Sequence, residues 1–193
     1  ELPPTEAPPP YSKNAPTVFP ENPDVAFATI SLPPTPPMHR PLDPPPSCFS
    51  TPTPVRIRSR SFAPFRIPSN SSRITDGFKP LYPPELLTKH GITEEDWGRF
   101  LADVRSTAHL AEKGISAVAP YRGTTGPLLL RAGGVGRQYD ATFGKTPVEE
   151  VKGLLDVWNG SAFERRKLRV TLMNRADEAT RTRAGYDLLV ESL

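Results

Sequence analysis

The residues Gly144-Lys145-Thr146 match the end of a phosphate-binding P-loop, whose backbone N–H groups cradle the phosphates of a nucleotide. That motif requires a glycine five positions before Gly144, but Tyr139 stands there. Pro147 also removes one N–H group that would help to hold the phosphate. The spacing therefore favours a loop followed by a helix cap. Gly133-Gly134-Val135-Gly136 is rejected as a dinucleotide loop because no hydrophobic strand precedes it.

The remaining reactive side chains form no recognisable catalytic or metal-binding motif. His39, His90 and His109 lack metal-ligand spacing, and we expect them to be solvated. The single cysteine, Cys48, excludes a disulfide scaffold and a cysteine-based zinc site. We therefore expect a protein that is not an enzyme and that has no catalytic residues, cofactor or metal.

Composition divides the 193 residues into two parts. Of the 26 prolines, 23 lie at or before Pro84, whereas all 13 glycines lie at Gly77 or later. The formal net charge of +3 is too small for a dedicated nucleic-acid binder. No apolar run approaches the roughly 18 to 20 residues that cross a bilayer, and the N-terminus lacks a signal-peptide layout. These features indicate a soluble or at most peripheral protein.

Residues 1–61 are predicted to form a disordered, proline-rich arm, because their sparse apolar side chains cannot offset the entropy lost on ordering. Pro8, Pro9 and Tyr11 fit the Pro-Pro-x-Tyr pattern that WW domains bind. Residues 40–44 resemble an SH3 ligand, with Asp43 where a proline usually packs. Thr35, Thr51 and Thr53 each precede a proline and so fit proline-directed phosphorylation. The alternative for the whole arm is a solvated linker.

A basic run lies in the C-terminal third of the chain and is a second candidate for partner binding. Near an anionic membrane, each of its cations would contribute about 1 kcal/mol. The alternative is an ordinary solvated turn. The candidate partner-binding residues of this run are Phe163, Arg165, Arg166, Lys167 and Arg169.

Two amphipathic helices and a strand are the elements that position these residues. Thr93 predicts a helix start, and apolar residues at intervals of three and four continue to a helix end near Gly114. Thr146 and Glu149 predict a capping box for a second helix that ends at Asn159-Gly160. Residues 168–172 alternate as in a strand, and residues 186–193 are either a partner strand or a final helix.

Together these elements predict an α+β fold, with two amphipathic helices packed on a small antiparallel sheet. The predicted domain covers residues 62–193 and contains a glycine-rich loop at 114–144. The expected core includes Trp97, Phe100, Val104, Leu155 and Trp158. The surface around 163–169 and the glycine-rich loop are the expected docking regions.

The order of these landmarks resembles the family that contains golgin subfamily A member 7 and the fungal accessory subunit of the Ras palmitoyltransferase. The resemblance covers residues 65–113 and 148–172. Its first block holds a short strand, a polar turn, the segment Tyr82-Pro83-Pro84-Glu85-Leu86 and the first helix. Its second block holds the second helix, Asn159, the aromatic Phe163 and the strand that follows. Where that family has an apolar, often cysteine-bearing segment between the helices, this chain has its glycine-rich loop.

The resemblance implies a noncatalytic accessory subunit that binds and stabilises a membrane-embedded DHHC-type protein S-acyltransferase. It also implies a peripheral location on the cytosolic face of the endoplasmic reticulum or Golgi membrane, where the basic run would contact anionic lipid. The proline-rich arm and the divergent family features are compatible with a fungal origin. The alternative is a soluble, cytoplasmic adaptor whose arm recruits WW or SH3 domain proteins. We expect no nucleic-acid partner.

Overall fold

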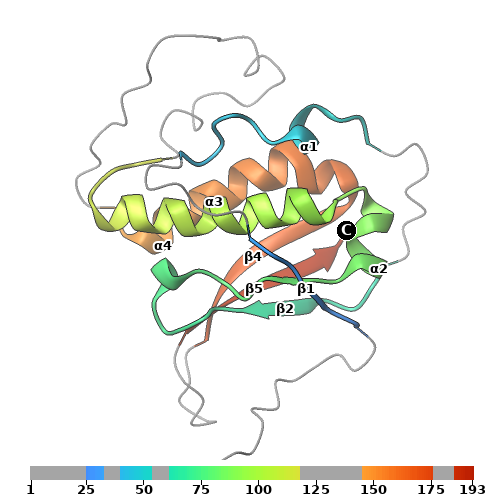
Figure 1. The fold of residues 1–193 in the computed structure, drawn as a ribbon, viewed down its shortest axis with the longest axis horizontal. Helices are drawn as coiled ribbons and strands as arrows, with labels where there is room; N and C mark the ends of the chain where they lie inside the picture. Colours follow the sequence, from blue (N-terminus) through green and yellow to red (C-terminus); the bar gives the residue numbers. More distant parts are fainter. Residues whose placement is uncertain (1–24, 33–39, 54–60, 118–144, 176–184) are drawn as a thin grey trace, which may run out of the picture.

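The computed structural model of the protein describes residues 25–32, 40–53, 61–117, 145–175 and 185–193. In these ranges, two long helices and two small sheets form one packed unit (Figure 1). The strands are β1 Ala28–Thr29, β2 Phe65–Pro68, β3 Leu81–Tyr82, β4 Leu168–Arg175 and β5 Gly185–Ser192. The helices and helical turns are α1 Ser47–Ser50, η1 Ile74–Asp76, α2 Pro84–Leu87, η2 Thr88–His90, α3 Glu94–Glu112, α4 Pro147–Trp158, η5 Asn159–Phe163 and η6 Glu164–Arg166.

Both long helices begin at the predicted caps. The Thr93 hydroxyl accepts the Asp96 N–H, and the Asp96 carboxylate accepts the Thr93 N–H in return. Thr146 and Glu149 form the same reciprocal pair at the start of α4, and these bonds lower the pKa of Glu149. Each capping box satisfies backbone donors that a helix start would otherwise leave without partners.

The α-helical part of α4 ends at Trp158 as predicted, but the chain does not leave the helix there. It continues through the π-helical turn η5 and the 3-10 turn η6. The helical path ends at Lys167, whose φ of 59° lies in the left-handed region. The predicted end of the α-helix at Asn159-Gly160 is therefore confirmed, and a π-helical turn and a 3-10 turn extend the helical path to Arg166.

The larger sheet is antiparallel with strand order β2-β5-β4. Strands β4 and β5 pair along their whole length, from Leu168 opposite Ser192 to Arg175 opposite Gly185. Of the two alternatives for the C-terminal segment, the strand is therefore the observed one. β1 and β3 form a separate two-stranded ribbon. The α+β class and the small antiparallel sheet are confirmed.

α3 and α4 lie side by side over one face of the larger sheet, as Figure 1 shows. A cluster of four fully buried aromatic side chains, Trp97, Phe100, Trp158 and Phe163, joins the two helices. Phe100 has ring-centroid distances of 5.2 Å to Trp158 and 5.1 Å to Phe163 in edge-on geometry, which favours aromatic pairs. Every predicted core residue is buried.

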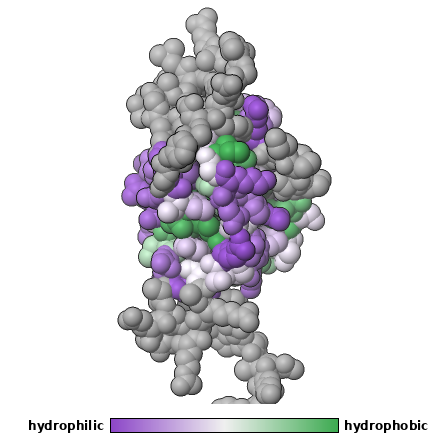
Figure 2. Space-filling view, turned by 90° about the vertical axis from the view of Figure 1, so that its left-hand side faces the viewer, coloured by the Kyte–Doolittle hydropathy of each residue, from purple (hydrophilic) through white to green (hydrophobic). Residues whose placement is uncertain are grey.

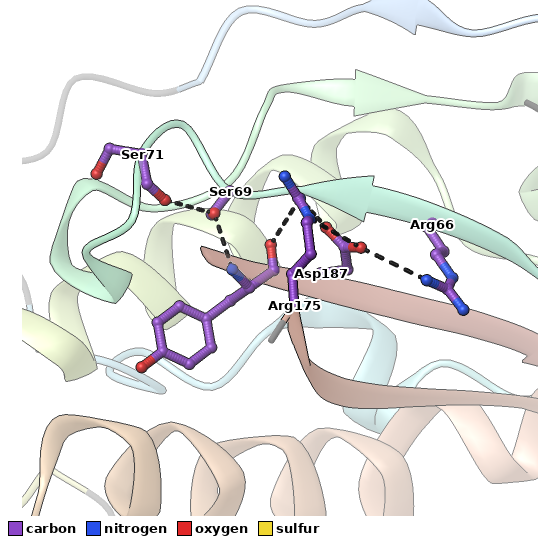
Figure 3. A network of polar contacts seen from close by, with 6 residues as sticks. Arg66, Ser69, Ser71, Arg175 and Asp187 are labelled. Carbon is purple, nitrogen blue, oxygen red and sulfur yellow. Dashed lines mark hydrogen bonds and ion pairs between the residues drawn. The ribbon is translucent and has the colours of Figure 1, made fainter. Parts of the chain in front are cut away.

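The opposite face of the sheet carries a polar network around Asp187 (Figure 3). Asp187 is only 6% exposed, forms a close ion pair with Arg175, and lies 3.8 Å from Arg66 on β2. Ser69 extends the network, because its hydroxyl donates to the Ser71 carbonyl and accepts the Tyr186 N–H. These contacts link all three strands at one end of the sheet.

Part of the segment that we predicted to be a disordered arm belongs to the folded unit. Residues 25–32 include β1 and the buried Ile30, and residues 40–53 bury Leu42 and Cys48. The boundary at residue 61/62 was therefore placed too late. Composition misled the prediction because a few apolar side chains, spaced between prolines, reach the core of the rest of the domain.

The surface around the C-terminal end of α3 is mostly hydrophilic, with small apolar patches between polar side chains (Figure 2). Arg73 pairs there with Glu112 at 2.5 Å, and His109 lies 4.0 Å from the same carboxyl group. No helix of the described ranges is long and apolar enough to cross a membrane.

Candidate functional site

The structure separates the predicted partner-binding residues into three groups. Phe163 and Arg166 are 0% and 1% exposed, so neither contributes to an exposed docking surface. Phe163 belongs to the aromatic cluster between the helices, and burial of a large ring there is favourable. The exposed members are Arg165, Lys167 and Arg169. Pro8, Pro9 and Tyr11 lie outside the described residues.

Along residues 163–169, here called the basic turn, the backbone changes from π-helical to 3-10 to left-handed conformation. The Lys167 N–H donates to the Glu164 carbonyl at 3.0 Å, and the Lys167 carbonyl accepts the Leu193 N–H at 2.9 Å. Arg169 pairs with Glu164 at 3.2 Å. Lys167 forms no ion pair with any residue that the structure describes. The turn therefore presents a fixed cationic surface suited to carboxylate or phosphate groups.

Residues 40–53, here called the clasp segment, lie across the first half of α3 and the basic turn. Leu42 fills the core while its backbone adopts φ 62°, a conformation that non-glycine residues rarely take. Polar contacts from both elements hold the segment. They join Leu42 N to Asp103 Oδ2 (3.3 Å), Ser47 Oγ to Asp96 Oδ1 (3.0 Å), Arg99 Nη2 to the carbonyls of Asp43 and Pro44 (3.3 Å each), Arg165 Nη1 to Phe49 O (3.0 Å) and Arg166 Nη2 to Thr51 O (3.1 Å).

Arg166 is a buried cation beneath the clasp segment. Its guanidinium donates to the carbonyls of Ala162 and Thr51, and its Nε has no hydrogen-bond partner. No carboxylate of the described ranges forms an ion pair with it. Burial lowers the pKa of Arg166, yet an arginine keeps its proton at neutral pH. The clasp segment therefore covers a positive charge whose hydrogen-bond acceptors are backbone carbonyls and which the Asp96 carboxylate attracts.

Cys48 lies in the same interface and is unsuited to nucleophilic chemistry. Burial raises the pKa of its thiol from the usual 9.0 to about 12. The Asp96 carboxylate acts in the same direction, and the Arg166 guanidinium opposes both. Because the thiolate is the reactive form, this protonated thiol is inert in the folded protein.

Sequence reasoning missed the role of His90, which we expected to be solvated. His90 is 3% exposed, and its Nδ1 lies 2.6 Å from the Arg166 carbonyl. Phe62 packs edge-on against its ring. His90 therefore contacts the basic turn through a backbone carbonyl, whereas the clasp segment contacts it through the side chains of Arg165 and Arg166. His109 is exposed as expected, and His39 lies outside the described residues.

Glu150 links the two chain segments that flank residues 118–144. Its carboxylate is fully buried, accepts the Ser116 hydroxyl at 2.9 Å, and lies 3.6 Å from the Lys145 ammonium. Lys145 thus pairs with a carboxylate, and Thr146 caps α4, which agrees with our choice of a helix cap over a P-loop. The glycine-rich loop lies largely outside the described residues. Over the ranges that the structure covers, no His, Cys, Asp and Glu side chains gather as metal ligands.

A family model described as a domain of unknown function, DUF4646, matches residues 46–166. The chain belongs to this family. The match begins within the clasp segment and ends at Arg166. The DUF4646 domain therefore includes both Thr51 and Arg166, which contact each other. This agreement supports the finding that the folded unit begins before residue 62.

One relative is an uncharacterized protein of Schizosaccharomyces pombe, C1198.03c, which is 27% identical over 139 residues. The alignment covers 72% of this chain and 55% of the relative, so this chain corresponds to about half of that protein. No solved structure matches the chain.

Proposed function

We propose that this DUF4646 protein is a noncatalytic accessory subunit, which binds and stabilises a membrane-embedded DHHC-type protein S-acyltransferase. The observation that carries the proposal is the state of Cys48. Protein S-acyl transfer needs a reactive thiolate, whereas the single cysteine of this chain is buried and protonated. In a complex of this kind, the reacting thiol belongs to the acyltransferase.

The resemblance to the golgin subfamily A member 7 family supports the same proposal through the contacts of its landmark residues. The Asn159 side chain donates to the Val170 carbonyl and accepts the Val170 N–H, at 2.9 and 3.0 Å. Phe163 packs against Trp97 and Phe100 of the first block. The order of landmarks therefore corresponds to contacts that join the two blocks.

The proposed docking surface consists of the exposed cations of the basic turn. Arg165, Lys167 and Arg169 are exposed within five residues around the start of β4, and acidic residues of the acyltransferase or an anionic lipid leaflet would complement them. The subunit then lies peripherally on the cytosolic face of the endoplasmic reticulum or Golgi membrane.

The test is co-expression of the chain with a DHHC acyltransferase, followed by measurement of acyltransferase abundance and acyl-exchange labelling of its substrate. We expect Lys167→Glu with Arg169→Glu to lower both readouts at least several-fold while the Tm stays unchanged. The matched control is Lys113→Glu with Lys152→Glu, which changes two exposed lysines elsewhere on the domain and alters the net charge by the same amount. Unchanged partner abundance and substrate acylation on complete deletion of the chain would refute the proposal.

A second candidate is a soluble adaptor that recruits WW-domain proteins, because Pro8, Pro9 and Tyr11 fit their ligand pattern. Tyr11→Ala removes the ring that the second pocket of a WW domain accepts, so it should abolish capture by an immobilised WW domain. Cell fractionation separates the two candidates: the accessory subunit sediments with membranes, and the adaptor stays in the supernatant.

A further inference from the structure

We propose that Thr51 is a phosphorylation site, and that Arg165 and Arg166 hold its phosphate group. The modifying enzyme would be a proline-directed Ser/Thr kinase, because Pro52 follows Thr51. This inference does not rest on the proposed accessory role.

Three observations make Thr51 different from a solvated threonine. Its side chain is exposed at the end of α1, and its φ of −68° and ψ of 131° are those of extended chain, the form in which kinases bind substrates. Its hydroxyl donates to the Ser47 carbonyl at 2.6 Å, so one side-chain hydrogen bond must break on phosphorylation. The Thr51 carbonyl accepts from Arg166 Nη2 at 3.1 Å, so a guanidinium already contacts the backbone of Thr51 itself.

The buried charge of Arg166 supplies the second argument. A buried cation is costly unless an anion pairs with it, and Arg166 has only carbonyl oxygens as hydrogen-bond acceptors. A phosphothreonine adds about −1.5 to −2 charges and three acceptor oxygens at neutral pH. Arg165, whose Nη1 contacts the Phe49 carbonyl at 3.0 Å, offers a second guanidinium from the solvent side. Asp96, which accepts from Ser47 and attracts Arg166, is the negative charge that opposes the phosphate group.

The reaction is an ordinary phosphoryl transfer from ATP. The bond between the γ-phosphorus and its bridging oxygen breaks, the Thr51 oxygen forms the new bond to phosphorus, and ADP leaves. The hydroxyl proton passes to the catalytic aspartate of the kinase. Arginine–phosphate contacts then fasten the clasp segment more firmly to the basic turn.

The test uses the full chain with ATP and a proline-directed kinase, in a Thr35→Ala, Thr53→Ala background that removes the neighbouring Thr-Pro sites. We expect mass spectrometry to locate phosphate on Thr51, and the Tm of the phosphorylated chain to rise by about 4 °C. We also expect phosphorus NMR to give a phosphate pKa below the usual value of about 6, because adjacent guanidiniums favour the dianion.

Arg165→Gln is the informative variant because Arg165 is exposed, whereas Arg166 is buried and Arg166→Lys risks misfolding. Arg165→Gln should reduce both the rise in Tm and the decrease in the phosphate pKa by at least half. Arg165→Lys should restore part of each effect. The proposal is overturned if the kinase leaves Thr51 unmodified in the folded chain. It is equally overturned if phosphate on Thr51 changes neither the Tm nor the phosphate pKa.

Discussion

At the scale of single residues, the interface beneath the clasp segment joins groups that the sequence keeps far apart. Asp96 caps α3 and also accepts the Ser47 hydroxyl, so one carboxylate serves a helix start and a segment 49 residues away in the chain. The Asp103 carboxylate likewise has two partners: it pairs with Arg99 at 3.0 Å and accepts the Leu42 N–H. Each of these groups would be costly to bury without its partners.

Cys48 makes the free energy of unfolding decrease at high pH. The unfolded thiol loses its proton near pH 9.0, whereas the folded thiol keeps it to about pH 12. Because the folded state then holds more protons, the free energy of unfolding falls as the pH rises above 9.0. Burial also raises the pKa of Tyr82 from its usual 10.0, which adds to the fall at still higher pH.

Urea unfolding at pH 8, 9, 10 and 11 measures this dependence. Cys48→Ala should reduce the slope between pH 9 and 10, and Tyr82→Phe should leave that part of the curve largely unchanged. An identical slope in the native chain and in Cys48→Ala would contradict the argument.

At the scale of elements, Asn159 shows why the π-helical turn matters. Among the described strands β4 lies at an edge of its sheet, and none of them pairs with its outward Val170 N–H and C=O groups. The Asn159 amide pairs with both, in the manner of a neighbouring strand. An exposed strand edge favours unwanted pairing between molecules, so this side chain both anchors α4 and protects the sheet.

We expect Asn159→Ala to lower the free energy of unfolding by about 1 to 3 kcal/mol, because it leaves two backbone groups of Val170 without partners. Asn174→Ala, at an exposed position on the same strand, is the control and should change it by less than about 0.5 kcal/mol. Urea titration of both variants provides the comparison, and equal effects would remove the special role of Asn159.

Local patterns predicted the elements well and their connections poorly. The capping residues Thr93 and Thr146 determine helix starts by contacts within one turn, so sequence alone was enough. The π-helical continuation begins at Asn159, whose contact with Val170 forms only in the folded chain. Alternation predicted β4, but only pairing with β4 distinguishes strand from helix for β5.

For the molecule as a whole, the N-terminal segments determine where the stable unit begins. A chain that starts at residue 62 loses Ile30, Leu42 and Cys48 from the core, together with β1. Full burial of each large aliphatic side chain contributes about 1.5 to 3 kcal/mol, so we expect the free energy of unfolding to fall by at least about 4 kcal/mol. Much of a typical domain's stability would be lost.

A chain that starts at residue 25 keeps all of these side chains and is the matched control. Calorimetry of the two truncated chains should show a Tm near that of the full chain for the longer one. The shorter one should show a large decrease or no cooperative transition. Equal Tm values would mean that residues 25–53 only decorate a domain that is complete without them.

The candidate site illustrates the limit of composition-based reasoning. Proline content correctly indicated an unusual N-terminal half, but it gave no sign that Leu42 and Cys48 would be buried. The charge run 163–169 looked uniform in sequence, yet η6 directs Arg166 inward and Arg165 outward. Such a division follows from backbone geometry at each position, which residue type alone does not encode.

Glu150 has a practical consequence for anyone who wishes to follow this protein in cells. Because its carboxylate contacts both Ser116 and Lys145, it keeps the two chain segments that flank residues 118–144 close together. A fluorescent protein whose termini lie close together can therefore be inserted between Ser116 and Lys145 without separating α3 from α4.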